Sequence, residues 1–513
     1  MTERTRRAIV VAGVMLTIFL AAMESTVVAT AMPTIVASLG GLRIYSWVFT
    51  AFLLTSTVTM PIWGRLSDLL GRRKTYVVGL TLFLGGSALS GLSQSMAQLV
   101  LFRALQGLGA GSLITLGMTV VGDLYQLEQR ARMQGYFSGV WGVASFVGPL
   151  LGGLLADHVS WRWVFYINLP FGALAALAIT WGLAGSARPS RRVSIDYRGA
   201  VLFTLTVSVF LLGLVEAGRA ARWLTLPVLG PLALAGGLLV AFIFVERRAQ
   251  SPLIPVALFR NPMVRAAAAT GFLAGMAMFG AISFVPLYVQ AVVGTTATQA
   301  GVVLTPFVLG WVTCSIVSAR LVLRTGYRAV VVAGMVSLTL AFFLLTEWDQ
   351  DLGRATAMRD VLLGGFGMGL IMVPMLIAVQ NAVPRADLGA GTSLIQFFRT
   401  IGGAVGIAVM GAVMAYRLQT ELLALSTSVG DGLGAQVQEL ARHPDLIINP
   451  LTRQALASSL VAPIRMALAQ ALHEVFVVGL IVSLVALASA FLVPAGRARE
   501  LASAREPAPT SRS

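Results

Sequence analysis

Long apolar runs alternate with short polar loops along almost the whole chain. A helix of roughly twenty residues rises about 30 Å, which matches the hydrocarbon core of a bilayer. Fourteen runs reach that length, at 8–31, 46–63, 75–93, 98–121, 134–155, 164–184, 199–217, 224–245, 266–292, 299–319, 329–346, 361–383, 389–415 and 474–493. The pattern predicts an all-α polytopic membrane protein with fourteen transmembrane helices.

Composition supports a membrane protein. Of 513 residues, 57% are hydrophobic and 11% are charged, and the mean hydropathy is +0.84. A soluble fold has no use for so much apolar surface. The net charge of +16 does not indicate nucleic acid as a partner, because the basic residues are divided among loops instead of forming one face. Cys314 is the only cysteine, so no intrachain disulfide is possible and the redox compartment cannot be read.

Basic residues concentrate in every second loop, and this bias predicts the orientation. Short loops rich in Arg and Lys stay in the cytoplasm. The richest loop carries Arg65, Arg72, Arg73 and Lys74, and basic residues also precede the first span and follow the last. The sequence therefore predicts a multi-pass protein with both termini in the cytoplasm.

The spacing of the spans predicts a six, two, six organisation. Two polar loops flank a hairpin at 199–245, and the polar segment near 416–473 is predicted to be external, with amphipathic helices around 433–442 and 452–472. The predicted parts are a six-helix bundle at 1–184, a linker with the inserted hairpin at 185–265, a second six-helix bundle at 266–496 and a disordered cytoplasmic tail at 497–513. In transporters built from such halves, the substrate site lies between them near the midplane.

The loop from Gly64 to Lys74 joins the second and third spans and is a candidate conformational latch. Gly64 and Gly71 permit a tight turn and close helix contact. Asp68 can pair with an Arg or face a helix N-terminus. We predict that Asp68, Arg72, Asp123 and Arg130 form a charge cluster that holds the outward-open state.

Glu24 and Arg103 are ionisable residues placed inside apolar spans. Such residues are costly in a membrane and usually face a cavity or each other. Glu24 is the candidate proton carrier, Arg103 its candidate partner, and Gln106 lies one turn on from Arg103. The alternatives are that Ser25 or Thr26 satisfies Glu24 near the interface, and that Arg103 snorkels to the external surface.

Small residues in the fifth span predict close packing. The run contains Gly148, Pro149, Gly152 and Gly153, where proline bends the helix and glycine lets helices approach. The functional interpretation is a pivot and seal between the halves. Ordinary membrane packing explains the spacing almost as well.

Aromatic and amide side chains within the spans are candidates for the substrate cavity. Aromatic faces attract cations. The candidates are Trp47, Phe52, Gln106, Trp141, Phe284, Tyr288, Gln290, Gln380, Asn381, Gln396, Phe397 and Arg399. Each aromatic or amide residue alone is more often packing than pocket. Arg399 can bind an anionic group, partner an acid or face the cytoplasmic end of its helix.

These motifs together resemble those of the major facilitator superfamily, in particular its fourteen-spanner drug:proton antiporters, the multidrug and quaternary-ammonium exporters. The resemblance covers almost the whole chain. It rests on the loop Gly64–Lys74 and on the segments Glu24–Val28, Met32–Pro33, Arg103–Gly111, Gly148–Gly153, Trp161–Gly172 and Arg399–Gly406. The family usually has Asp at Glu24 and glycine at Ala144. Glutamate at position 24 keeps the carboxyl group but changes how far it extends from the backbone.

The resemblance implies a transporter of the bacterial inner (cytoplasmic) membrane that exports amphipathic or cationic small molecules in exchange for protons. No cofactor is expected beyond the proton as coupling ion. Three alternatives stay open: a lipid or glycolipid exporter whose segment 416–473 contacts a periplasmic or cell-wall partner, a nutrient importer, and a membrane sensor or scaffold without transport. An enzyme is not expected, since the sequence has no phosphate loop, metal-ligand spacing or nucleophile elbow.

Overall fold

All regular structure in the described part of the chain is helical. The computed structural model describes residues 2–40, 44, 47–184, 196–219, 225–250, 252–295, 297–429, 431–442 and 458–496. The first part contains α1 (Glu3–Leu39), α2 (Trp47–Leu70), α3 (Arg72–Leu92), α4 (Met96–Leu124), α5 (Leu127–His158), α6 (Trp163–Tyr166) and α7 (Asn168–Gly182). The hairpin is α8 (Tyr197–Arg219) and α9 (Leu226–Glu246). The last part contains η2 (Val256–Arg260), α10 (Pro262–Ala291), α11 (Ala297–Thr325), α12 (Tyr327–Thr346), α13 (Arg354–Ala382), η3 (Arg385–Asp387), α14 (Leu388–Ser428), α15 (Asp431–Arg442) and α17 (Ser458–Ala490).

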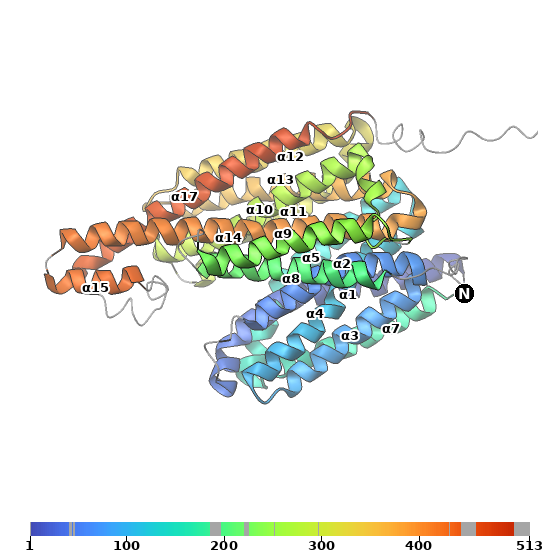
Figure 1. The fold of residues 1–513 in the computed structure, drawn as a ribbon, viewed down its shortest axis with the longest axis horizontal. Helices are drawn as coiled ribbons and strands as arrows, with labels where there is room; N and C mark the ends of the chain where they lie inside the picture. The colour runs from blue at the N-terminus through green and yellow to red at the C-terminus, as the bar shows by residue number, and fades with distance from the viewer. Residues whose placement is uncertain are drawn as a thin grey trace, which may run out of the picture.

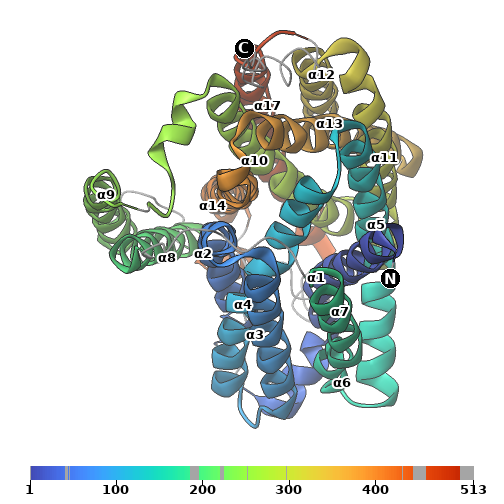
Figure 2. The same cartoon turned by 90° about the vertical axis from the view of Figure 1, so that its right-hand side faces the viewer.

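The predicted spans correspond to helices of membrane-crossing length. Within the described residues, length and composition identify thirteen candidate spans, with α6 and α7 together forming one of them. The predicted span at 134–155 lies within α5, which has 32 residues and packs along α1 and α11 (Figure 2). The chain is therefore an all-α, multi-pass membrane protein, as the hydropathy pattern predicts.

The long helices form two groups that meet at one end of the molecule. Helices α1–α7 pack together, and α10–α17 pack together. The groups touch mainly where α2 meets α14 and α5 meets α11. Figure 1 shows them close together near the N-terminus and diverging toward the opposite end. We call the end that holds Glu3 the inner end and the opposite end the outer end. The molecule is closed at its inner end.

The hairpin of α8 and α9 lies against the line where the two groups meet. Figure 2 shows it beside α2 and α14. Phe203 of α8 packs on Phe397 of α14, with ring centroids 5.3 Å apart, and Val58 of α2 belongs to the same apolar cluster. Most of α9 is exposed. A helix that faces lipid can expose apolar side chains at little cost in free energy. The hairpin therefore contacts both groups at once.

Helix α14 extends well beyond the predicted span at 389–415. Its 41 residues correspond to about 60 Å, twice the hydrocarbon thickness. At the outer end α15 folds back against it (Figure 1). The helix predicted at 433–442 is therefore present within α15. The separate helix predicted at 452–472 is not, because its described residues, from Ser458, belong to the continuous helix α17. The tail at 497–513 and residues 185–195 lie outside the described residues.

Candidate functional site

Glu24 and Arg103 form a buried ion pair inside the first helix group. Arg103 Nη1 donates to Glu24 Oε1, joining α4 to α1. The side chains of Glu24 and Arg103 are 0% and 1% exposed. An interface position for Glu24 and a snorkelling Arg103 both require contact with water or headgroups, so this burial contradicts both alternatives. The structure brings together the two ionisable residues that the sequence singled out.

Neighbouring polar groups hold the pair in place. Arg103 Nη1 also donates to Gln106 Oε1 at 2.7 Å, and the guanidinium carbon lies 4.1 Å from the centre of the Phe52 ring. Asn168 Nδ2 donates to Glu24 Oε2 at 2.7 Å and to Ser87 Oγ at 2.9 Å. Both carboxylate oxygens of Glu24 thus accept a hydrogen bond.

Asn168 was missed as a site residue by sequence analysis. It lies within the Trp161–Gly172 segment and starts α7, where the chain breaks between α6 and α7 at Ile167. A buried amide at the start of an otherwise apolar helix was the available signal, since such a group needs a partner. Gln106, predicted as a substrate contact, belongs to the same ion-pair cluster.

Asp68 latches the two helix groups at the inner end. Its carboxylate accepts hydrogen bonds from the backbone of Gly389 at 2.9 Å and Ala390 at 2.8 Å, in the first turn of α14. Arg72 bonds the same carboxylate and also donates to Asp123 Oδ2 at 2.7 Å. A negative charge at a helix N-terminus is stabilising, more so when partly buried. Asp68 therefore contributes to closure directly, and Arg72 orients it.

Three further polar contacts close the inner end. Arg65 donates to Asp387 at 2.8 Å, joining α2 to η3. Arg130 of α5 donates to Asn381 Oδ1 at 2.9 Å, and Asn381 donates to the Tyr327 hydroxyl at 2.9 Å. Gln380 Nε2 donates to the Met118 carbonyl of α4 at 3.1 Å. Gln380 and Asn381, predicted as substrate contacts, lie instead among the groups that close the inner end.

Close backbone approach explains three of the predicted glycines. A methyl group at Gly64 would come within 2.5 Å of the Gly389 carbonyl oxygen of α14. Methyl groups at Gly148 and Gly152 would come within 2.0 and 2.1 Å of the Thr26 and Thr30 hydroxyl oxygens of α1. Small residues at these points let the helices touch. Because α1 and α5 belong to the same group, Gly148 and Gly152 pack within that group.

The other predicted gating residues are placed differently. Gly71 breaks the chain between α2 and α3 with φ of 92°, a conformation that favours glycine. Gly153 faces open space, with nothing within 4 Å of an added methyl group, so close packing does not explain it. Pro149 lies within α5, and its side chain is outside the described residues.

The pair Gly152 and Gly153 gives a matched test of this packing. Gly152→Val is expected to destabilise the protein by about 1–3 kcal/mol, because the new side chain collides with α1. Gly153→Val is expected to change stability by less than about 0.5 kcal/mol. Thermal unfolding of the purified variants measures both. Equal losses would show that helix propensity, and not the α1–α5 contact, sets the effect.

Arg399 and Gln396 lie on α14, within its candidate membrane span. Arg399 Nη1 approaches the Met372 sulfur of α13 at 3.9 Å. Within the described residues, Arg399 Nε and Gln396 Nε2 are buried and have no hydrogen-bond partner. No carboxylate of the described chain forms an ion pair with Arg399. The structure therefore does not support the interpretation that Arg399 partners a resident acid.

The remaining aromatic candidates do not converge on one site. Tyr288 packs against Trp348 and Phe476 inside the second group, with ring centroids 5.3 and 5.8 Å away, and Phe397 packs under the hairpin. These two side chains, predicted as substrate contacts, are engaged in packing in this structure. Phe284 is buried in the same core as Tyr288. The three other candidates, two tryptophans and one glutamine, are half-buried: Trp47, Trp141 and Gln290.

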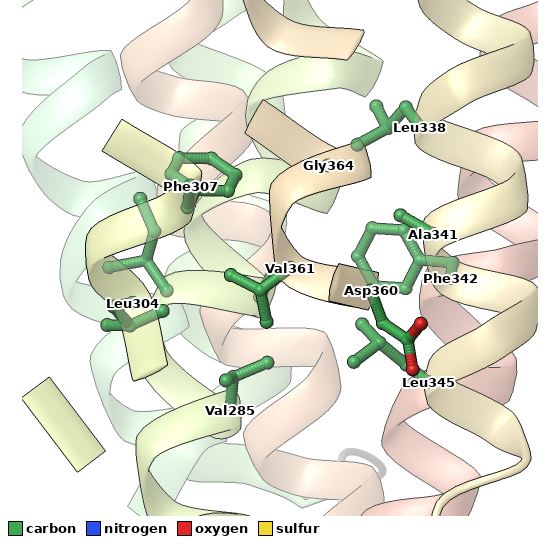
Figure 3. Close-up of a pocket in the computed structure, with 12 residues that line it drawn as sticks. Val285, Leu304, Phe307, Leu338, Ala341, Phe342, Leu345, Asp360, Val361 and Gly364 are labelled. Atoms are coloured by element: carbon green, nitrogen blue, oxygen red, sulfur yellow. The ribbon is translucent and has the colours of Figure 1, made fainter. Parts of the chain in front are cut away.

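A small apolar pocket lies inside the second group near its outer end. Helices α10–α13 line it, and Asp360 is the one carboxylate among its lining residues (Figure 3). Asp360 accepts from Trp348 Nε1 at 3.0 Å and from Arg359 Nε at 2.8 Å. Since both of its oxygens are bonded, Asp360 serves to join the loop after α12 to α13. Among the described residues, no group of three His, Cys, Asp or Glu side chains could hold a metal ion.

Similar proteins share both the sequence and the fold. A sequence profile described as the Major Facilitator Superfamily matches residues 14–407. Multidrug transporter protein MdtP of Bacillus subtilis (strain 168) is 38% identical over 96% of this chain and 94% of its own. Multidrug resistance protein 3 of the same organism is 32% identical over 96% and 95%.

Among solved structures, the human organic anion transporter MFSD10 (TETRAN) matches with a TM-score of 0.61 at 17% identity. The match covers 94% of this chain and 100% of that chain. At this identity the likeness concerns the fold alone.

Proposed function

The chain belongs to the Major Facilitator Superfamily, and we propose that it is a secondary active transporter that exports amphipathic or cationic drugs in exchange for protons. Two relatives are named as a multidrug transporter protein and a multidrug resistance protein, which supports drug efflux and a transporter rather than an enzyme. The observation that carries proton exchange is the fully buried pair of Glu24 and Arg103. A lone carboxylate that is buried and reversibly paired can take up and release a proton as its surroundings change.

The coupling step acts on this pair. A proton that reaches Glu24 from the outer side neutralises the carboxylate and weakens its bond to Arg103. Because Asn168, Gln106 and Phe52 contact the same two side chains, the change alters how α1, α4 and α7 pack. Substrate and proton then compete for the same half of the transporter, so binding of one releases the other.

Alternating access follows from the closed inner end. The described helices meet there through Asp68, Arg65 and Arg130 and diverge at the outer end (Figure 1). This arrangement corresponds to an outward-facing state. We assign the inner end to the cytoplasm because the basic loops lie there, in a bacterial inner membrane with both termini cytoplasmic. Rocking of the two six-helix groups breaks these contacts and opens the inner end.

Transport in proteoliposomes tests the function. With an imposed pH gradient, ethidium is expected to accumulate in the acidic compartment, because protons leave as the dye enters. Dissipating the gradient with a protonophore is expected to stop accumulation. Ethidium movement that does not depend on the pH gradient would contradict proton exchange. No ethidium movement at all would favour the lipid exporter, which labelled lipid in the same vesicles would test.

A further inference from the structure

Arg399 carries a positive charge deep in the membrane. It lies eleven residues after the first residue of α14, Leu388, which places it about 16 Å along the helix. That depth is close to the middle of a hydrocarbon core about 30 Å thick. A guanidinium there stays charged and cannot extend its side chain far enough to reach the headgroups.

Three acids of the two helix groups, Glu24, Asp68 and Asp360, bond other partners. Glu24 bonds Arg103 and Asn168. Asp68 bonds Arg72 and the start of α14, and Asp360 bonds Trp348 and Arg359. The charge of Arg399 is thus left without a counter-charge from the described residues. The side chain is partly buried and its Nε is fully shielded. An unpaired charge in such a place is costly, and a functional reason is expected for its retention.

Gln396 adds a second group that lacks an acceptor. It lies one turn before Arg399 on α14, so the two side chains share a face. Its side chain is 4% exposed, and Nε2 has no hydrogen-bond partner among the described residues. The unpartnered groups of the two residues are donors: the guanidinium Nε–H of Arg399 and the amide NH₂ of Gln396.

The position of these donors connects them to the path between the helix groups. Thr392, one turn further toward the inner end, accepts from Gln380 at 3.4 Å, and Gln380 also donates to Met118 of the first group. Met372, which contacts Arg399, lies about two turns from Gln380 on α13. Arg399 and Gln396 therefore lie just to the outer side of a contact that closes the molecule.

We propose that Arg399 and Gln396 form a binding site for an anionic group, a carboxylate, sulfonate or phosphate carried by an amphipathic molecule. Such a ligand supplies the acceptors and the counter-charge that the chain lacks, and Arg can bind it through two parallel hydrogen bonds. The inference rests on the proposed transport function and assigns it a substrate class: amphiphiles with an acidic group, in addition to cations. The acidic group can belong to a soluble organic anion or to a lipid headgroup.

Binding of carboxyfluorescein to the full chain in phosphatidylcholine nanodiscs tests the site. Arg399→Gln is expected to raise the dissociation constant by about 10- to 100-fold, because a charged hydrogen-bonded contact is lost. Arg399→Lys keeps the charge but not the two parallel hydrogen bonds, so it is expected to lose less affinity than Arg399→Gln. It also shows whether the site still folds. Arg417→Gln on the same helix is the control, since Arg417 pairs with Glu421 at 2.9 Å, and it should bind as the parent does.

Ethidium and phosphatidylglycerol complete the experiment. Ethidium binding is expected to be unchanged or tighter in Arg399→Gln. If phosphatidylglycerol in the nanodisc competes with carboxyfluorescein, the acidic group that the site binds belongs to a lipid headgroup. If it does not compete, the acidic group belongs to a soluble organic anion. Unchanged carboxyfluorescein binding in Arg399→Gln, or equal loss of both dyes, would overturn the site. Because ethidium transport tests the proposed function separately, either proposal can fail alone.

Discussion

Glu24→Gln is expected to abolish ethidium accumulation driven by a pH gradient. Glutamine keeps the shape and a hydrogen-bond acceptor for Arg103 but cannot carry a proton. It also leaves the buried guanidinium without a counter-charge, which is expected to lower the free energy of unfolding by about 3–5 kcal/mol. Transport in proteoliposomes and unfolding in detergent mixtures measure the two effects.

Two control variants separate coupling from stability. Glu24→Asp keeps the acid and is expected to keep gradient-driven transport at a reduced rate, since the shorter side chain loosens its contacts with Arg103 and Asn168. The double variant Glu24→Gln with Arg103→Gln is expected to be more stable than the sum of the single losses implies, because neither charge is left alone. The double variant is still expected not to couple ethidium transport to the pH gradient. Gradient-driven transport by the double variant would show that the proton binds elsewhere.

Asp68→Asn is expected to shift the protein toward the state that is open at the inner end. The variant removes a charge that bonds the first turn of α14, an interaction worth up to about 2 kcal/mol in a partly buried site. That energy changes the ratio of the two states by about 30-fold. Spin labels on the exposed inner-end residues Lys74 and Arg324 report the distance between the groups, after Cys314→Ser removes the single cysteine.

Asp123→Asn is the matched control for the latch. Asp123 bonds Arg72 within the first group and is 33% exposed. Asp123→Asn is expected to change the ratio of the inner-closed to the inner-open state by only a few-fold, as for other exposed ion pairs. If Asp68→Asn and Asp123→Asn gave the same distance distribution as the parent, the bond from Asp68 to α14 would have no part in closure.

The spans and the ion pair could be predicted because each carries a local physical signal. An apolar run of membrane length forms a helix whatever surrounds it, since backbone groups in lipid must be satisfied internally. Glu24 and Arg103 stand out because charge inside such a run is rare. The burial of their contact and the role of Asn168 depend on how α1, α4 and α7 pack, which one sequence does not reveal.

Residue type alone does not tell which substrate candidates lie together. Gln380 and Asn381 lie at the closed inner end because they are in the last turn of α13. Phe397 lies under the hairpin because of helix rotation, which residue type does not encode. Residue type also does not distinguish Gly152 from Gly153. An added methyl group would collide with α1 at Gly152 and would face open space at Gly153. The length of α14 was underestimated because its outer turns are held by α15 and not by lipid.

Proton release on drug binding tests the central role of Glu24 most directly. Ethidium is added to the purified protein in weakly buffered solution, at a pH where the free protein has taken up its proton, and the pH change is recorded. The account predicts that the parent protein releases protons as ethidium binds and that Glu24→Gln binds ethidium without releasing any. Equal release by both proteins would contradict the account and move the proton site away from Glu24.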